Sequence, residues 1–139
     1  MKNVLIPFLL IVSGIFFLPA CTKYVLKAVD DNGISLYNCS KKTTGVPNIC
    51  FDSLITDSRC PTGGVCIWQG TAIVQVTFHE NEQLHTFKMS LKGFPSLGHP
   101  ADTTINGYKI IFTDLKPYPE INKPTPKEND IKATFSITR

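Results

Sequence analysis

The chain has 139 residues, enough for one domain, and 14 Lys and Arg against 11 Asp and Glu give a net charge of only +3. This balance, with no basic stripe, argues against a nucleic-acid-binding protein. At the N-terminus, Lys2 precedes residues 4–18, which carry no charged side chain. A membrane-spanning helix needs about 20 apolar residues, so this shorter run is typical of a secretory signal. The alternatives are a buried hydrophobic helix or an uncleaved anchor.

The end of this run, Leu-Pro-Ala-Cys at residues 18–21, resembles the lipobox of bacterial lipoproteins. The resemblance implies that the Cys21 thiol receives a diacylglycerol group and that cleavage makes Cys21 the new N-terminus, usually acylated as well. More than one acyl chain anchors a protein stably to a membrane. We therefore expect a lipoprotein signal peptide at residues 1–20 and a single membrane-anchored envelope domain at residues 21–139. An ordinary signal peptide cut nearby is the alternative.

The residue after the lipobox cysteine bears on where the anchored domain is sorted. Thr22 stands at the position where Asp acts as a retention signal in enterobacterial-type sorting. We therefore expect a protein of the bacterial cell envelope, held by lipid, at the outer membrane.

Four more cysteines follow Cys21, namely Cys39, Cys50, Cys60 and Cys66. An even number in an exported protein is typical of two disulfides formed in an oxidising compartment. Three pairings are possible, and the turn-forming residues within each short segment favour Cys39–Cys50 and Cys60–Cys66. A four-cysteine zinc site is the alternative, but the spacings lack the C-x2-C pairs that such sites favour. We therefore expect no metal and no cofactor.

Apolar and polar residues alternate with a period of two along the mature chain, which predicts strands rather than helices. The clearest expected strands cover residues 24–29, 34–38, 49–56, 66–78, 108–115 and 131–138. A further strand, which pairs with residues 66–78 in the first hairpin of the next paragraph, brings the expected total to about seven strands. Short turns between them predict an all-β protein, an antiparallel β-sandwich or a small barrel.

Two hairpins are expected. Reversal of the chain at residues 80–83 would place Phe78 opposite His85 and Val76 opposite Phe87, so that both strands put apolar residues on one face. Asn106-Gly107 is a favoured dipeptide for a tight two-residue turn.

A proline-rich segment covers residues 116–130 and contains four prolines, Pro117, Pro119, Pro124 and Pro126. Proline cannot donate a ladder hydrogen bond, so this segment is expected to be an extended surface loop. It is either a crossover that protects a sheet edge or a partner-docking loop, and we favour the crossover.

The stretch DSRCPTGGVCIWQG at residues 57–70 combines two cysteines, the single tryptophan, one proline and three glycines. We interpret it as a structural staple, in which Pro61 helps the chain to turn back between Cys60 and Cys66. Trp68 is expected on the core face of the strand that follows, and Gly70 is expected to allow a close approach of the backbone.

The polar residues of this stretch have structural interpretations too. Asp57 and Ser58 can accept backbone N–H bonds where the loop begins. Asp57 and Arg59 are expected to form a local ion pair rather than a substrate clamp. A catalytic Ser58 would need a histidine base and an acid. The chain has three histidines, His79, His85 and His99, but none lies in a recognised catalytic motif. We therefore expect no enzyme.

The sequence DSRCP, followed by Cys66, Trp68 and Gly70, resembles a widespread family of small exported bacterial proteins, many of them lipoproteins. The resemblance covers roughly residues 49–137 and includes GYKIIFTDLKPYP at residues 107–119. It implies an all-β domain and export, and it implies no established activity.

Three functions remain open at this stage. The favoured one is a non-catalytic envelope domain that binds a protein or polymer partner while its lipid holds it to the membrane. The second is a protease inhibitor, because Thr43-Thr44-Gly45 resembles the inhibitory loop of chagasin-type cysteine-protease inhibitors. The third, an enzyme, has no catalytic constellation to support it.

Overall fold

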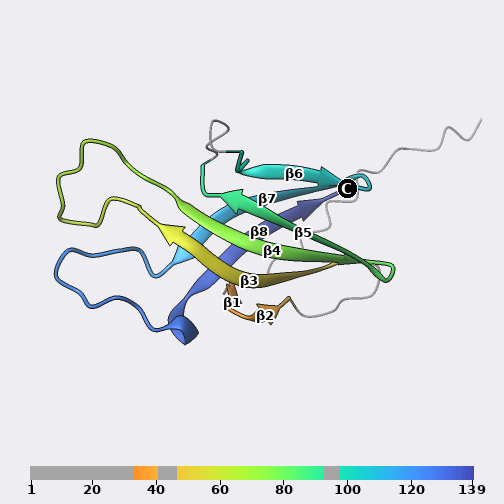
Figure 1. Ribbon diagram of the computed structural model, residues 1–139, viewed down its shortest axis with the longest axis horizontal. Helices are drawn as coiled ribbons and strands as arrows, with labels where there is room; N and C mark the ends of the chain where they lie inside the picture. Colours follow the sequence, from red (N-terminus) through yellow and green to blue (C-terminus); the bar gives the residue numbers. More distant parts are fainter. Residues whose placement is uncertain (1–32, 41–46, 93–97) are drawn as a thin grey trace, which may run out of the picture.

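The computed structural model describes residues 33–40, 47–92 and 98–139, which form two four-stranded antiparallel sheets packed together as a β-sandwich (Figure 1). One sheet has the strand order β1-β8-β7-β6 and the other the order β2-β3-β4-β5. The strands are β1 (Ile34–Ser35), β2 (Asn38–Cys39), β3 (Asn48–Asp57), β4 (Ala72–Glu80), β5 (Gln83–Ser90), β6 (Asp102–Ile105), β7 (Tyr108–Lys116) and β8 (Lys132–Thr138). A 3-10 helix, η2 (Glu128–Asp130), precedes β8.

The predicted sandwich is therefore confirmed, with eight strands among the described residues. The predicted strand at residues 24–29, the lipidation site Cys21 and the tripeptide at residues 43–45 lie outside those residues. Within the described part of the chain, no helix is long and apolar enough to cross a membrane.

The core lies between the two sheets and is built from the inward-facing residues of the strands. In β8, Ala133, Phe135 and Ile137 are buried, as the alternation of that segment predicts. Phe78 of β4 and Tyr108 of β7 connect the sheets, with ring centroids 5.9 Å apart. Burial of an apolar side chain of this kind contributes about 1.5–3 kcal/mol, so these alternating positions account for much of the stability.

Both predicted hairpins form, and the first has the predicted register. Phe78 pairs with His85 and Val76 with Phe87 in the hairpin of β4 and β5. In the hairpin of β6 and β7, Ile105 pairs with Tyr108 across the turn. The residues of that turn, Asn106 and Gly107, have φ angles of 48° and 82°. Positive φ at both turn positions gives the twist that antiparallel strands need, which is why Asn-Gly is favoured there.

The prediction that a strand runs from Cys66 to Phe78 is wrong in its first part, because β4 begins only at Ala72. Gly70 has a φ of +62°, a left-handed conformation that interrupts an extended strand. Trp68 lies before this break and is 73% exposed, so its predicted place in the core is wrong as well. The six residues that the alternation assigned to a strand belong to a loop instead.

The strand predicted at residues 34–38 is also divided. A turn at Leu36 and Tyr37 separates β1 from β2, and Tyr37 has a φ of 62°. The two short strands therefore join different sheets, β1 beside β8 and β2 beside β3.

Candidate binding site

The loop between β3 and β4, residues 58–71, is closed on itself and is called the stapled loop below. Its two arms pair through backbone hydrogen bonds from Ser58 N to Thr71 O and from Cys60 N to Gln69 O, both 2.9 Å long. The predicted Cys60–Cys66 disulfide closes the outer part. Pro61 O accepts a hydrogen bond from Gly64 N at 3.0 Å and forms the turn between the two cysteines. These contacts hold the loop in one shape.

The base of the stapled loop explains the roles of Ser58 and Gly70. The Ser58 hydroxyl donates to Thr71 O at 2.9 Å and accepts from Thr71 N at 3.1 Å. A Cβ atom on Gly70 would lie 1.7 Å from the carbonyl oxygen of Ser58. The predicted backbone bond to Ser58 and the predicted close approach at Gly70 are both confirmed. The Ser58 hydroxyl thus has a structural use, and both of its hydrogen bonds go to backbone.

Arg59 is buried and connects the stapled loop to the other sheet. Its guanidinium contacts both oxygens of Asp57, with Nε to Oδ1 at 2.8 Å and Nη2 to Oδ2 at 2.7 Å. It also donates to Leu115 O at 2.6 Å and to Pro117 O at 3.0 Å, just where β7 ends. The predicted ion pair of Asp57 and Arg59 is therefore present, and Arg59 has a further role that the sequence did not reveal. Its contacts fix the start of the proline-rich segment.

The proline-rich segment predicted as a loop at residues 116–130 is a loop only at residues 117–127, because Lys116 ends β7 and Glu128–Asp130 form η2, and it lies against the stapled loop at one end of the sandwich (Figure 1). Thr62 N donates to Pro119 O at 2.9 Å, and Ile121 N donates to Thr62 O at 3.3 Å. Thr62 and Glu120 thereby form an isolated parallel bridge. Each of the two loops thus supports the other.

Large apolar side chains point outward from these two loops. Val65 and Ile67 are fully exposed, Trp68 is 73% exposed, and Ile121 of the proline-rich segment is 58% exposed. We call these four residues the apolar tip. Burial of each of these exposed side chains against a partner would be favourable, so the four residues are the candidate contact residues of an interaction surface.

A cavity of about 240 Å³ lies beside the base of the stapled loop. It is lined by Arg59, Cys60, Gln69, Gly70, Thr71, Leu91, Lys92 and Tyr118. Sites for drug-sized ligands usually measure about 300–1,000 Å³. This cavity is smaller than that range.

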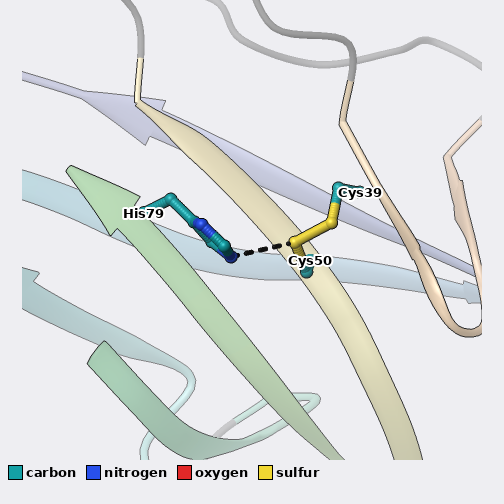
Figure 2. Close-up of side chains that lie close together, drawn as sticks. All are labelled: Cys39, Cys50 and His79. Atoms are coloured by element: carbon teal, nitrogen blue, oxygen red, sulfur yellow. Dashed lines mark hydrogen bonds between the residues drawn. A yellow bond between two sulfur atoms is a disulfide. The ribbon is translucent and has the colours of Figure 1, made fainter. Parts of the chain in front are cut away.

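The second predicted disulfide, Cys39–Cys50, is also present and joins β2 to β3. His79 of β4 lies beside it, with Nε2 3.3 Å from Cys50 Sγ (Figure 2). These three residues place potential metal-ligand atoms within 4.8 Å of one another. Both sulfurs are bonded to each other, however, and the ligand form of cysteine is the free thiolate. The four-cysteine zinc alternative fails for the same reason, since all four sulfurs are in disulfides.

Comparison of the chain with protein-family models, with curated proteins and with solved structures yields no significant match. The resemblance to the DSRCP family of exported proteins therefore stays a prediction from the motif residues.

Proposed function

We propose that this protein is a non-catalytic binding module of the bacterial cell envelope, which is tethered by lipid on Cys21 and docks a protein partner through the apolar tip. The exposure of Trp68 beside Val65 and Ile67 on a disulfide-closed loop is the observation that carries the proposal. Tryptophan is among the residues most enriched at energetic hot spots of protein interfaces. A loop that is already rigid loses little conformational entropy when it binds, which favours affinity.

The charges around the apolar tip favour a protein over a lipid surface as the partner. Near Ile121, Glu120 and Lys123 form an exposed ion pair at 2.8 Å. At the base of the stapled loop, Arg59 is paired with Asp57. A surface that docks on anionic lipid carries an excess of Lys and Arg, whereas an apolar centre with a polar rim is typical of protein interfaces.

Site-specific photocrosslinking tests this proposal. A benzophenone amino acid at Ile67 is expected to give one discrete protein adduct in intact cell envelopes. Excess purified wild-type domain should suppress the adduct, and the Trp68→Asp domain should not. The same crosslinker at Lys109 of β7, an exposed position outside the apolar tip, is the control and should give none. If the Ile67 probe labels only lipid, or if the Trp68→Asp domain competes as well as wild type, the proposed docking surface is wrong.

Protease inhibition is the second candidate function. Its support is the stapled loop, a protruding, disulfide-closed segment with exposed apolar side chains that could occupy the cleft of a protease. Inhibition assays against papain-like and serine proteases separate the two candidates. Tight inhibition that Trp68→Asp abolishes would favour the inhibitor.

The lipid anchor gives a separate prediction. Cys21→Ser removes the thiol that the lipobox resemblance assigns to diacylglycerol, so the protein should move from the membrane fraction to the soluble fraction. Fractionation with mass spectrometry checks this outcome. A variant that stays with the membranes and keeps a lipid mass increment would contradict the prediction.

A further inference from the structure

The cluster of Cys39, Cys50 and His79 takes no part in the proposed docking surface and has a chemistry of its own. Cys39 is exposed on β2, whereas Cys50 of β3 is only 6% exposed. The contact from His79 Nε2 to Cys50 Sγ is 3.3 Å (Figure 2). A disulfide sulfur carries no proton, so a hydrogen bond in this contact requires the tautomer of His79 with its proton on Nε2, which makes the imidazole N–H the donor.

We propose that Cys39–Cys50 is a thiol–disulfide exchange site, which a low-molecular-mass thiol opens by attack on Cys39. The thiolate of the external thiol forms a bond to Cys39 Sγ, and the bond between Cys39 Sγ and Cys50 Sγ breaks. The electron pair leaves with Cys50 Sγ, which takes up a proton from solvent. A second external thiol then attacks the mixed disulfide and releases Cys39 as a thiol. The two external thiols leave as their disulfide, having supplied both electrons.

Access and leaving-group stability both favour attack on Cys39 rather than on Cys50. An external thiol can approach the exposed Cys39 more readily than the buried Cys50. Exchange is faster when the departing sulfur is the better leaving group. The N–H of His79 already contacts Cys50 Sγ and strengthens that bond as negative charge develops on the sulfur. Attack on Cys39 therefore expels Cys50 Sγ, the sulfur that His79 stabilises.

The Cys60–Cys66 disulfide differs in this respect and serves as an internal reference. Around Cys60 Sγ the described contacts are the carbonyl oxygens of Pro61 and Gly64, at 4.0 Å and 3.9 Å. Carbonyl oxygens accept hydrogen bonds and do not stabilise a departing thiolate. The two disulfides of the one chain should thus open at different rates.

The test is a time course of the oxidised full domain with glutathione, stopped with iodoacetamide and read by peptide mass spectrometry. Cys39–Cys50 should open about ten times faster than Cys60–Cys66, with glutathione on Cys39 and the alkyl group on Cys50. His79→Leu should slow the opening of Cys39–Cys50 about tenfold, the loss expected for one charge-assisted hydrogen bond. It should leave Cys60–Cys66 unchanged.

The control variant is His99→Asn, which changes a histidine whose described hydrogen bond uses only its backbone oxygen. Both rates should equal those of wild type. A loosened fold would speed the opening of both disulfides, which is opposite in sign to the effect expected for His79→Leu. Glutathione found on Cys50, equal rates for the two disulfides, or an unslowed His79→Leu variant would each overturn the proposal.

Discussion

Gly70→Ala is expected to lower the free energy of unfolding by about 3 kcal/mol or more, because it combines a left-handed backbone with a steric clash. The φ of +62° costs an L-residue about 1–2 kcal/mol by itself. The added Cβ would also lie 1.7 Å from the carbonyl oxygen of Ser58, a distance that no side-chain rotation can relieve. The arms of the stapled loop must then separate, and urea denaturation measures the loss.

Gly107→Ala is the matched control for this variant. Gly107 has a φ of +82°, and a Cβ atom there would meet nothing within 4 Å. This variant carries the backbone cost alone, so about 1–2 kcal/mol should be lost. Equal losses for the two variants would show that the contact between Gly70 and Ser58 is not as close as described.

Arg59→Ala is expected to cost about 3 kcal/mol, the usual consequence of removing one partner of a buried ion pair. The side chain is only 4% exposed, and that of Asp57 is 21% exposed. Loss of the guanidinium leaves the Asp57 carboxylate without its cation. It also leaves the carbonyls of Leu115 and Pro117 without this donor. Denaturation curves should shift to lower urea, and hydrogen exchange should rise in the proline-rich segment.

Lys109→Ala provides the comparison for an exposed pair. Lys109 and Asp102 are 2.9 Å apart, and both side chains are about half exposed. Because solvent screens such pairs, the loss should stay below about 1 kcal/mol. A loss for Arg59→Ala no larger than this would contradict the structural role given to Arg59.

The strands and hairpins could be predicted because their signals are local. In the hairpin of β4 and β5, the alternation along each strand agrees with the register across the turn. A shift of the register by one residue would put the apolar side chains of the two strands on opposite faces of the sheet. Asn106-Gly107 likewise specifies its turn through backbone preferences of the two residues alone. Both disulfides were predictable from short spacings and turn-forming residues.

The candidate site was harder to predict, because it depends on contacts between distant segments. Arg59 donates hydrogen bonds to the backbone oxygens of Leu115 and Pro117, which lie more than fifty residues away in the chain, and no sequence pattern predicts these contacts. The position of Trp68 outside the strand could have been predicted from the residues beside it. Val65 and Ile67 are apolar at odd positions and Trp68 at an even one, so the alternation of β4 does not extend back through them. Gly70 marks the place where it stops.

The accessibility of Trp68 tests the proposed docking surface most directly, and the chain has a single tryptophan, so its fluorescence reports this residue alone. Acrylamide should quench the emission of the native, oxidised protein almost as strongly as that of the urea-denatured chain, with an emission maximum typical of indole in water. A native protein whose emission is shifted to the blue and resists acrylamide would place Trp68 in the core and would contradict the apolar tip.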